Sequence, residues 1–262
     1  MYPILCDYYR SKIQDTQEKL LDSMKKMTEN LRNKIIVALD SSNVLHQISI
    51  VKQLGDAINF YKIGLSSIAS GGLGLANELK AQGKRVFIDL KLFDIGNTIE
   101  KAVHGLSQFD IDFLTVHGDP HVIKAAIKGK RNSKLKILAV TLLTSLNRED
   151  LDKSLIRNGT VENLVTKRAK IAFDSGADGI ICSPNEVKRA RSLKNSTGKI
   201  IVTPGIRLAG NKLHDQKRVG DPASTLNSGA DYLVIGRPIT EAKNPLKEVK
   251  TIISQMMENL KV

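Results

Sequence analysis

Two acidic residues and a lysine lie close together in the sequence, directly after a short apolar segment. Asp89, Lys91 and Asp94 follow residues 86–88, and a single apolar residue separates Asp89 from Lys91. Because side chains alternate along a strand, Asp89 and Lys91 should share one face near the carboxyl end of that strand. Charges this close are costly to bury unless they serve each other or a ligand. The segment is therefore either a structural ion pair or the charged part of a functional site.

The elements that would position these residues repeat a pattern of a short apolar strand followed by a helix. Continuously apolar strands are typical of a parallel sheet that is buried on both faces. Eight repeats in about 230 residues indicate an α/β fold, a closed (β/α)₈ or TIM barrel. An open doubly wound sheet is the alternative, but no G-x-G-x-x-G motif follows the first strand. The predicted strands are residues 35–39, 60–64, 86–91, 113–117, 135–141, 179–182, 199–203 and 232–235.

Residues 1–33 differ from this pattern and predict an N-terminal helical extension ahead of a barrel catalytic domain over residues 34–262. The extension should consist of one or two amphipathic helices packed on the outside of the barrel. It lacks the apolar core of a targeting peptide, and the sequence assigns it no function. The apolar residues at helical spacing are Ile13, Leu20, Leu21, Met24 and Leu31.

Polar or charged residues follow nearly every predicted strand, which a random placement of surface charges would not produce. Barrel enzymes carry their sites at the carboxyl ends of the strands. This pattern favours a functional site over a structural ion pair at Asp89. A lone histidine such as His117 is expected to be a hydrogen-bonded wall residue. The residues at the strand ends are Asp40, Lys62, Asp89, Lys91, Asp94, His117, Thr144, Arg207, Gly236 and Arg237.

The seventh and eighth strands end in segments that could bind a phosphate, as the corresponding loops do in many barrels. Gly205 and Gly236 would let backbone N–H groups approach an anion closely. Arg207 and Arg237 could add charge-assisted contacts. The long polar segment 208–218 is expected to close over the ligand as a lid, with an inert surface loop as the alternative.

The composition limits the partners. The net charge of +13 suggests an anionic ligand. The lysines are spread over most predicted helices, and no RNA-binding or zinc-finger pattern accompanies them. We therefore expect no nucleic-acid partner. No apolar run reaches the roughly 18–20 residues that span a bilayer, so no membrane partner is expected. Cys6 and Cys182 lie far apart, which favours a reduced, cytoplasmic setting. No metal-binding spacing of histidines occurs.

The strand-end segments resemble the orotidine 5′-phosphate decarboxylase family over about residues 34–262. Asp89-x-Lys91-x-x-Asp94 is similar to the D-x-K-x-x-D signature of that family, which related sugar-phosphate lyases share. Phe93 and Gly96 depart from it, because the family often has His and Pro there, and only the stiffness of the loop is affected. The other matching segments are 37–40, 61–64, residue 95 with 97–98, 143–145, 203–207, 215–218 and 236–238.

The resemblance implies decarboxylation of orotidine 5′-phosphate to uridine 5′-phosphate and CO₂, the last step of de novo pyrimidine synthesis, without cofactor or metal. Lys91 would protonate C6 of the ring, and Asp89 would lie beside the substrate carboxylate. Asp94 would reach the site of a neighbouring subunit together with Thr98, so the active unit would be a homodimer with shared sites. The catalytic residues implied are Lys91, Asp89 and Asp94. The substrate-binding residues implied are Asp40, Lys62, Asp89, Lys91, Asp94, Ile95, Thr98, Thr144, Pro204, Arg207, Gln216, Gly236 and Arg237.

Physical chemistry supports these implied roles. Loss of CO₂ leaves a carbanion with little delocalisation, and without an electron-sink cofactor only a fixed cation can stabilise it. An ammonium held between two carboxylates stays protonated, is preorganised where the charge develops, and can then supply the proton. One lysine cannot supply the upper end of the roughly 8–23 kcal/mol that enzymes remove from a barrier, so binding of the distant phosphate must contribute.

Two other functions remain open. A sister enzyme, such as a Mg²⁺-dependent 3-keto-gulonate 6-phosphate decarboxylase or a hexulose phosphate synthase, normally needs a Glu near the second strand end, where this chain has Lys62. A basic barrel that has lost catalysis and binds nucleotides or RNA is the other alternative, against which the complete charged array argues.

Overall fold

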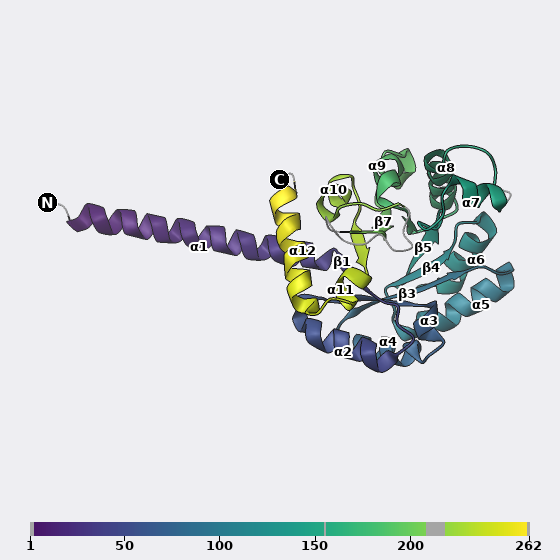
Figure 1. The fold of residues 1–262 in the computed structure, drawn as a ribbon, viewed down its shortest axis with the longest axis horizontal. Helices are drawn as coiled ribbons and strands as arrows, with labels where there is room; N and C mark the ends of the chain where they lie inside the picture. The colour runs from purple at the N-terminus through teal and green to yellow at the C-terminus, as the bar shows by residue number, and fades with distance from the viewer. Residues whose placement is uncertain (1–2, 155, 208–217, 261–262) are drawn as a thin grey trace.

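Eight parallel strands close into a barrel in chain order in the computed structural model, which describes residues 3–154, 156–207 and 218–260, with side chains from residue 15 onward (Figure 1). The closed barrel confirms the predicted (β/α)₈ fold and rules out the open sheet. The strands are β1 (Ile35–Leu39), β2 (Phe60–Gly64), β3 (Arg85–Leu92), β4 (Phe113–His117), β5 (Lys136–Val140), β6 (Gly179–Ile181), β7 (Ile200–Thr203) and β8 (Tyr232–Ile235).

Helices surround the barrel and connect each strand to the next. The α-helices are α1 (Pro3–Asn33), α2 (Val44–Leu54), α3 (Leu65–Ile68), α4 (Gly72–Ala81), α5 (Gly96–Leu106), α6 (Pro120–Lys130), α7 (Arg148–Lys153), α8 (Val161–Asp174), α9 (Val187–Arg191), α10 (Pro222–Asn227), α11 (Arg237–Thr240) and α12 (Pro245–Asn259). The short 3₁₀ helices are η1 (Gly55–Ala57), η2 (Ser107–Phe109), η3 (Pro184–Glu186) and η4 (Lys194–Ser196).

The strands are apolar on both faces because each face contributes to a different core. One cluster of buried side chains lies between the strands and the surrounding helices. A second cluster fills the barrel interior, and its ten buried members include Ile36, Phe60, Phe87 and Val202. This double burial explains why the strands show continuous apolar runs in place of an alternating pattern.

Aromatic side chains and one arginine fill the amino-terminal end of the barrel. The guanidinium of Arg85 lies 4.0 Å from the ring centroid of Phe60 and donates a hydrogen bond to the hydroxyl of Tyr232 at 3.2 Å. The rings of Phe60 and Phe113 pack edge to face with centroids 5.0 Å apart. The interior is therefore packed at this end, and the open space lies at the carboxyl ends of the strands.

Helix α1 is a single long helix that projects away from the barrel and crosses α12 only near its carboxyl end (Figure 1). Leu31 is buried and Met27 packs against the core, whereas Leu20 and Met24 are 62% and 48% exposed. The helical extension is confirmed, but the expectation that it packs on the outside of the barrel is wrong for the stretch that carries Leu20, Leu21 and Met24, whose side chains are exposed. No described helix is long and apolar enough to cross a membrane.

Candidate active site

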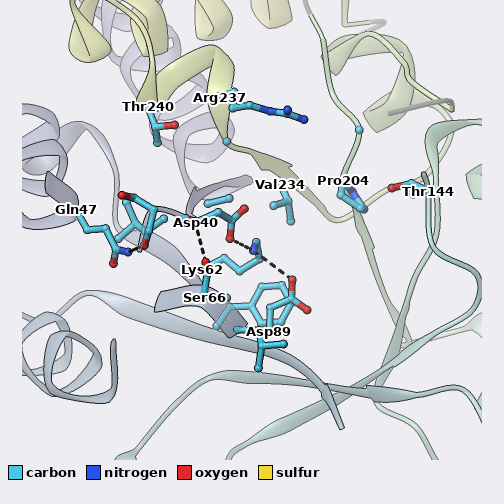
Figure 2. Close-up of a pocket in the computed structure, with 18 of the residues that line it drawn as sticks. Asp40, Gln47, Lys62, Ser66, Asp89, Thr144, Pro204, Val234, Arg237 and Thr240 are labelled. Carbon is cyan, nitrogen blue, oxygen red and sulfur yellow. Dashed lines mark hydrogen bonds and ion pairs between the residues drawn. The ribbon is translucent and has the colours of Figure 1, made fainter. Parts of the chain in front are cut away.

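A cavity of about 900 Å³ lies at the carboxyl ends of the strands and brings most of the predicted site residues together. Its walls come from the ends of β1, β2, β3, β7 and β8 and from the segment after β5. Figure 2 shows Asp40, Lys62 and Asp89 connected in a row, with Arg237 and Thr144 elsewhere around the same cavity. The predicted residues that line it are Asp40, Lys62, Asp89, Lys91, Thr144, Pro204, Arg207, Gly236 and Arg237.

Four charged side chains form a row in which anions and cations alternate. The ammonium Nζ of Lys62 lies 2.6 Å from Oδ1 of Asp40 and 3.2 Å from Oδ2 of Asp89. The other carboxylate oxygen of Asp89, Oδ1, lies 2.9 Å from Nζ of Lys91. Lys62 and Asp89 are largely buried, whereas the Lys91 and Asp40 side chains are partly open to the cavity. The row therefore fixes two ammonium groups at the mouth of the barrel.

The central pair of this row is held in its charged form. Burial alone would lower the pKa of Lys62, but the carboxylates of Asp89 and Asp40 outweigh it, so the pKa is raised above its ordinary value. Burial alone would raise the pKa of Asp89, but the ammonium groups of Lys62 and Lys91 and the Thr115 hydroxyl lower it to about 2. Asp89 is thus an anion at neutral pH although little of it is exposed.

Strand β3 reaches this geometry through a bulge. Its register with β4 shifts between Ile88 and Leu92, and Lys91 has a φ of 49°, in the left-handed region that L-residues rarely adopt. The Lys91 N–H donates to the hydroxyl oxygen of Thr115 at 3.0 Å, and that hydroxyl donates to Asp89 at 2.8 Å. Simple alternation from Phe87, which lies in the barrel interior, places Asp89 on the inner face, and the bulge lies between Ile88 and Leu92, where Lys91 takes its left-handed conformation.

Two residues that sequence reasoning missed shape the row. Thr115 on β4 connects Asp89 to the backbone of Lys91, and its place on the inner face, between Phe113 and His117, was the signal available. Gly64, at the end of β2, leaves room for the row, because a Cβ there would lie 2.7 Å from Oδ1 of Asp40. Gly64 was part of a matching segment but had received no role.

Three predicted residues do not line the cavity of their own chain. Asp94, Ile95 and Thr98 lie exposed on the connection between β3 and α5 and on the first turn of that helix. The Asp94 carboxylate accepts a hydrogen bond from the N–H of Ile95 at 2.7 Å, and no ion pair joins it to Lys91 among the side chains that the structure describes. Within one chain, Lys91 therefore has Asp89 as its carboxylate partner, without the second one that the sequence suggested.

The remaining candidates divide between the cavity wall and other positions. His117 lies outside the cavity and its Nδ1 is 2.5 Å from a carboxylate oxygen of Asp119, which agrees with a wall residue. Gln216, and with it positions 208–217 of the expected lid, lies outside the described residues.

The side of the cavity expected to bind phosphate is built from two glycine-containing turns. Gly205 has a φ of 80°, and Gly236 is the residue before helix α11. Backbone hydrogen bonds hold the Gly205 turn: the Arg207 N–H donates to the Gly220 carbonyl at 3.0 Å, and the Gly220 N–H donates to the Gly205 carbonyl at 3.1 Å. Arg207 and Arg237 also line the cavity. Cationic side chains and the backbone of two glycines, Gly205 and Gly236, therefore lie on the same side of it.

Comparisons with known proteins identify the family of the chain. The model of the orotidine 5′-phosphate decarboxylase / HUMPS family matches residues 33–252. A protein of Ruegeria pomeroyi named orotidine 5′-phosphate decarboxylase is 56% identical over 225 residues, which are 86% of this chain and 94% of the relative. A protein of the same name from Jannaschia sp. is 51% identical over 225 residues, 86% of this chain and 98% of the relative.

A solved structure shows the same similarity in three dimensions. The crystal structure of orotidine 5′-phosphate decarboxylase from Lactobacillus acidophilus superposes with a TM-score of 0.74 at 34% identity, and the match covers 86% of this chain and 99% of that one. The extent of the family match, the identity of these relatives and the row of charges at the barrel mouth all agree. The chain belongs to the orotidine 5′-phosphate decarboxylase / HUMPS family.

Proposed function

We propose that this protein is an orotidine 5′-phosphate decarboxylase, which converts orotidine 5′-phosphate to uridine 5′-phosphate and CO₂ in pyrimidine synthesis. Relatives that bear this name are 46–56% identical to the chain. The observation that carries the proposal is the alternating row Asp40–Lys62–Asp89–Lys91, with separations of 2.6, 3.2 and 2.9 Å, at the wall of a nucleotide-sized cavity. Because the proposed reaction is a step of pyrimidine biosynthesis, we expect the protein to be cytoplasmic.

Lys91 and Asp89 suit the bond changes of this reaction. As the bond between C6 and the carboxylate breaks, CO₂ leaves and the electron pair remains on C6. The Lys91 ammonium stabilises that charge and then donates its proton to C6. Asp89, with a pKa of about 2, is anionic and would repel a substrate carboxylate beside it until CO₂ departs. Lys91 is regenerated by a proton from water.

The other lining residues would bind the rest of the nucleotide. Asp40 and Lys62 would bind the ribose hydroxyls, and their mutual ion pair orients both groups before substrate arrives. Thr144 would contact the pyrimidine edge. Arg207, Gln216, Gly236 and Arg237 would bind the phosphate, and Pro204 would contact the nucleotide. Binding energy gained at the phosphate can then be used at the distant reacting carbon.

The proposed active unit is a homodimer in which Asp94, Ile95 and Thr98 complete the site of the partner subunit. Two observations support it: these three residues are exposed and do not line the cavity of their own chain, and Phe93 and Ile95 next to Asp94 are 63% and 70% exposed. A second copy of the chain could cover these apolar side chains. The Asp94 carboxylate of one subunit would then approach the Lys91 ammonium of the other, which has only Asp89 as a carboxylate partner within its own chain. The proposed partners are thus the nucleotide substrate and a second copy, with no nucleic acid and no membrane.

The Mg²⁺-dependent sugar-phosphate enzymes are not favoured. The family description includes them, but the curated relatives carry the decarboxylase name, and the end of β2 presents the Lys62 ammonium where that group of enzymes would need a carboxylate.

The test is the loss of orotidine 5′-phosphate absorbance in the presence of EDTA. We expect turnover that the chelator does not change, lost by several orders of magnitude in Lys91→Ala and kept in Lys19→Ala, an exposed lysine of α1. Turnover of a keto-sugar phosphate that EDTA abolishes and Mg²⁺ restores, without activity on orotidine 5′-phosphate, would replace this proposal by the sister function. RNA binding at physiological salt without any turnover would support the inactive binding protein.

A further inference from the structure

A buried ion pair that the proposed reaction does not use lies behind the cavity wall. Nη1 of Arg218 is 2.6 Å from Oε1 of Glu186, and the two residues are 8% and 2% exposed. Neither residue lines the cavity. A buried ion pair is a poor source of stability, because removing two charges from water offsets most of their attraction. The position of this pair therefore calls for another explanation.

The Arg218 side chain reaches the segment that carries Thr144. Its Nη2 donates to the backbone carbonyl of Leu143 at 2.8 Å and more weakly to that of Leu142 at 3.5 Å. Leu143, Thr144 and Ser145 all line the cavity. One planar guanidinium thus binds a carboxylate with one nitrogen and the backbone next to the proposed pyrimidine edge with the other.

Glu186 connects the same guanidinium to the turn after β6. Its second carboxylate oxygen accepts hydrogen bonds from the N–H of Ser183, at 3.1 Å, and from the Ser183 hydroxyl. These bonds form a capping box at the start of η3 (Pro184–Glu186). The capping box holds the Glu186 carboxylate independently of its contact with Arg218.

The backbone of Arg218 continues directly into the phosphate side of the cavity. Two residues later, Gly220 exchanges backbone hydrogen bonds with Gly205 and Arg207. Gly220 also packs so tightly on Pro184 that a Cβ there would clash with the proline ring. Residues 218–220 are therefore held between η3 and the Gly205 turn and have little freedom to shift.

From these contacts we propose that Arg218 is a positioning residue that fixes the pyrimidine-edge segment 143–145 relative to the phosphate-side segment 205–207. This inference rests on the proposed function, because it assumes that one nucleotide contacts both segments. The Arg218 side chain holds one segment, and the backbone of Gly220, two residues later, holds the other, so the short stretch 218–220 sets the distance between them. Loss of the Arg218 contacts should weaken the binding of ligands that contact both segments more than the binding of ligands that contact one of them.

The test compares binding of uridine 5′-phosphate and of uridine, which lacks the phosphate, to the full-length protein by isothermal titration calorimetry. In Arg218→Lys, one ammonium cannot bind Glu186 and the Leu143 carbonyl in the same geometry. We expect the ratio of the two dissociation constants, the preference for the phosphorylated ligand, to fall about tenfold or more, since misplacements of about 1 Å can cost a hundredfold in well-aligned sites. The kcat/KM for orotidine 5′-phosphate should fall with it.

The matched control is Arg191→Lys. Arg191 also binds a carboxylate, that of Asp231 at 2.6 Å, and several backbone carbonyls, but it lies outside the cavity lining. It should lower the melting temperature comparably and leave the preference unchanged. A second variant, Glu186→Gln, removes the anion that holds the guanidinium and should lower the preference in the same direction if Arg218→Lys fails to fold.

Two results would overturn the inference: an unchanged preference in a folded Arg218→Lys or Glu186→Gln protein, which includes equal weakening of both ligands, or the same fall in Arg191→Lys. Each of these can occur in a protein whose wild type decarboxylates orotidine 5′-phosphate, so the inference can fail while the proposed function stands. A wild type that does not turn over this substrate would instead refute the proposed function.

Discussion

The buried carboxylate of Asp89 should make the stability of this protein depend on pH in a way that one substitution removes. Its pKa in the folded protein is about 2, against an ordinary value of 3.8. Because the folded value is the lower one, the stabilisation is fully present above the unfolded pKa and is lost as the pH falls through the folded pKa. A difference of almost two pKa units corresponds to about 2 kcal/mol, of which about 1 kcal/mol is lost by pH 3.

The assay is urea unfolding of wild type and Asp89→Asn between pH 7 and pH 3. Asparagine cannot titrate, so the difference in unfolding free energy between the two proteins should shrink by about 1 kcal/mol over this range. Part of this difference does not depend on pH, including the cost of leaving the Lys62 and Lys91 ammonium groups without the Asp89 charge. That part is the same at pH 7 and pH 3, so it does not affect the change. Glu258→Gln is the control: Glu258 is an exposed residue of α12 outside the cavity, and no ion pair joins it to a cation among the described side chains, so this variant should follow the wild type.

A difference that stays constant, or grows, as the pH falls would refute the reasoning. It would mean that Asp89 is not held as an anion by Lys62 and Lys91 in the folded protein. The electrostatic row at the barrel mouth would then have to be withdrawn as the basis of the proposed chemistry.

Four further results are expected. Lys91→Gly and Lys91→Ala should both be inactive, but the glycine variant should be the more stable by about 1 kcal/mol, or 2–4 °C in Tm, because it relieves the left-handed backbone at this position; equal Tm values would argue against that strain. Gly64→Ala should leave stability almost unchanged, since the exposed Asp40 carboxylate can swing away, but should weaken nucleotide binding about tenfold through loss of the Asp40–Lys62 contact; unchanged calorimetric affinity would contradict this. Arg237→Ala should raise KM for orotidine 5′-phosphate and have little effect on orotidine, and equal losses would show that Arg237 does not touch phosphate. Mixing Asp94→Asn with Lys91→Ala should restore part of the activity in heterodimers with one intact site, and no recovery would count against shared sites.

The sequence predicted the barrel and the gathering of Asp40, Lys62, Asp89 and Lys91 at one end of it because both follow from local patterns, but it did not predict that Lys62 lies between Asp40 and Asp89. Strands buried on two faces read as apolar runs, and charges at their carboxyl ends must converge once the barrel closes. The bulge at Lys91 was not predictable in this way, since it depends on pairing with β4 and on the Thr115 hydroxyl.

Contacts between distant segments were also beyond the sequence patterns. The pair Arg218–Glu186 joins residues that are 32 positions apart, and nothing in the local sequence of either residue indicates its partner. The position of Asp94 outside its own cavity follows from the turn between β3 and α5, which the spacing of the signature alone does not define. The projection of α1 depends on how few of its apolar residues meet the barrel.

The packing of Arg85 against Phe60, Phe113 and Tyr232 has a consequence for the route by which the reaction products leave. With ring centroids 5.0–5.7 Å apart, these side chains pack closely across the amino-terminal end of the barrel. Under the proposed reaction, CO₂ released beside Asp89 would therefore depart by the opening through which the nucleotide entered. A small neutral gas can slip past a bound nucleotide, whereas the nucleotide must first break its phosphate contacts. Under the proposed reaction, the gas therefore escapes first, and departure of the nucleotide ends each catalytic cycle.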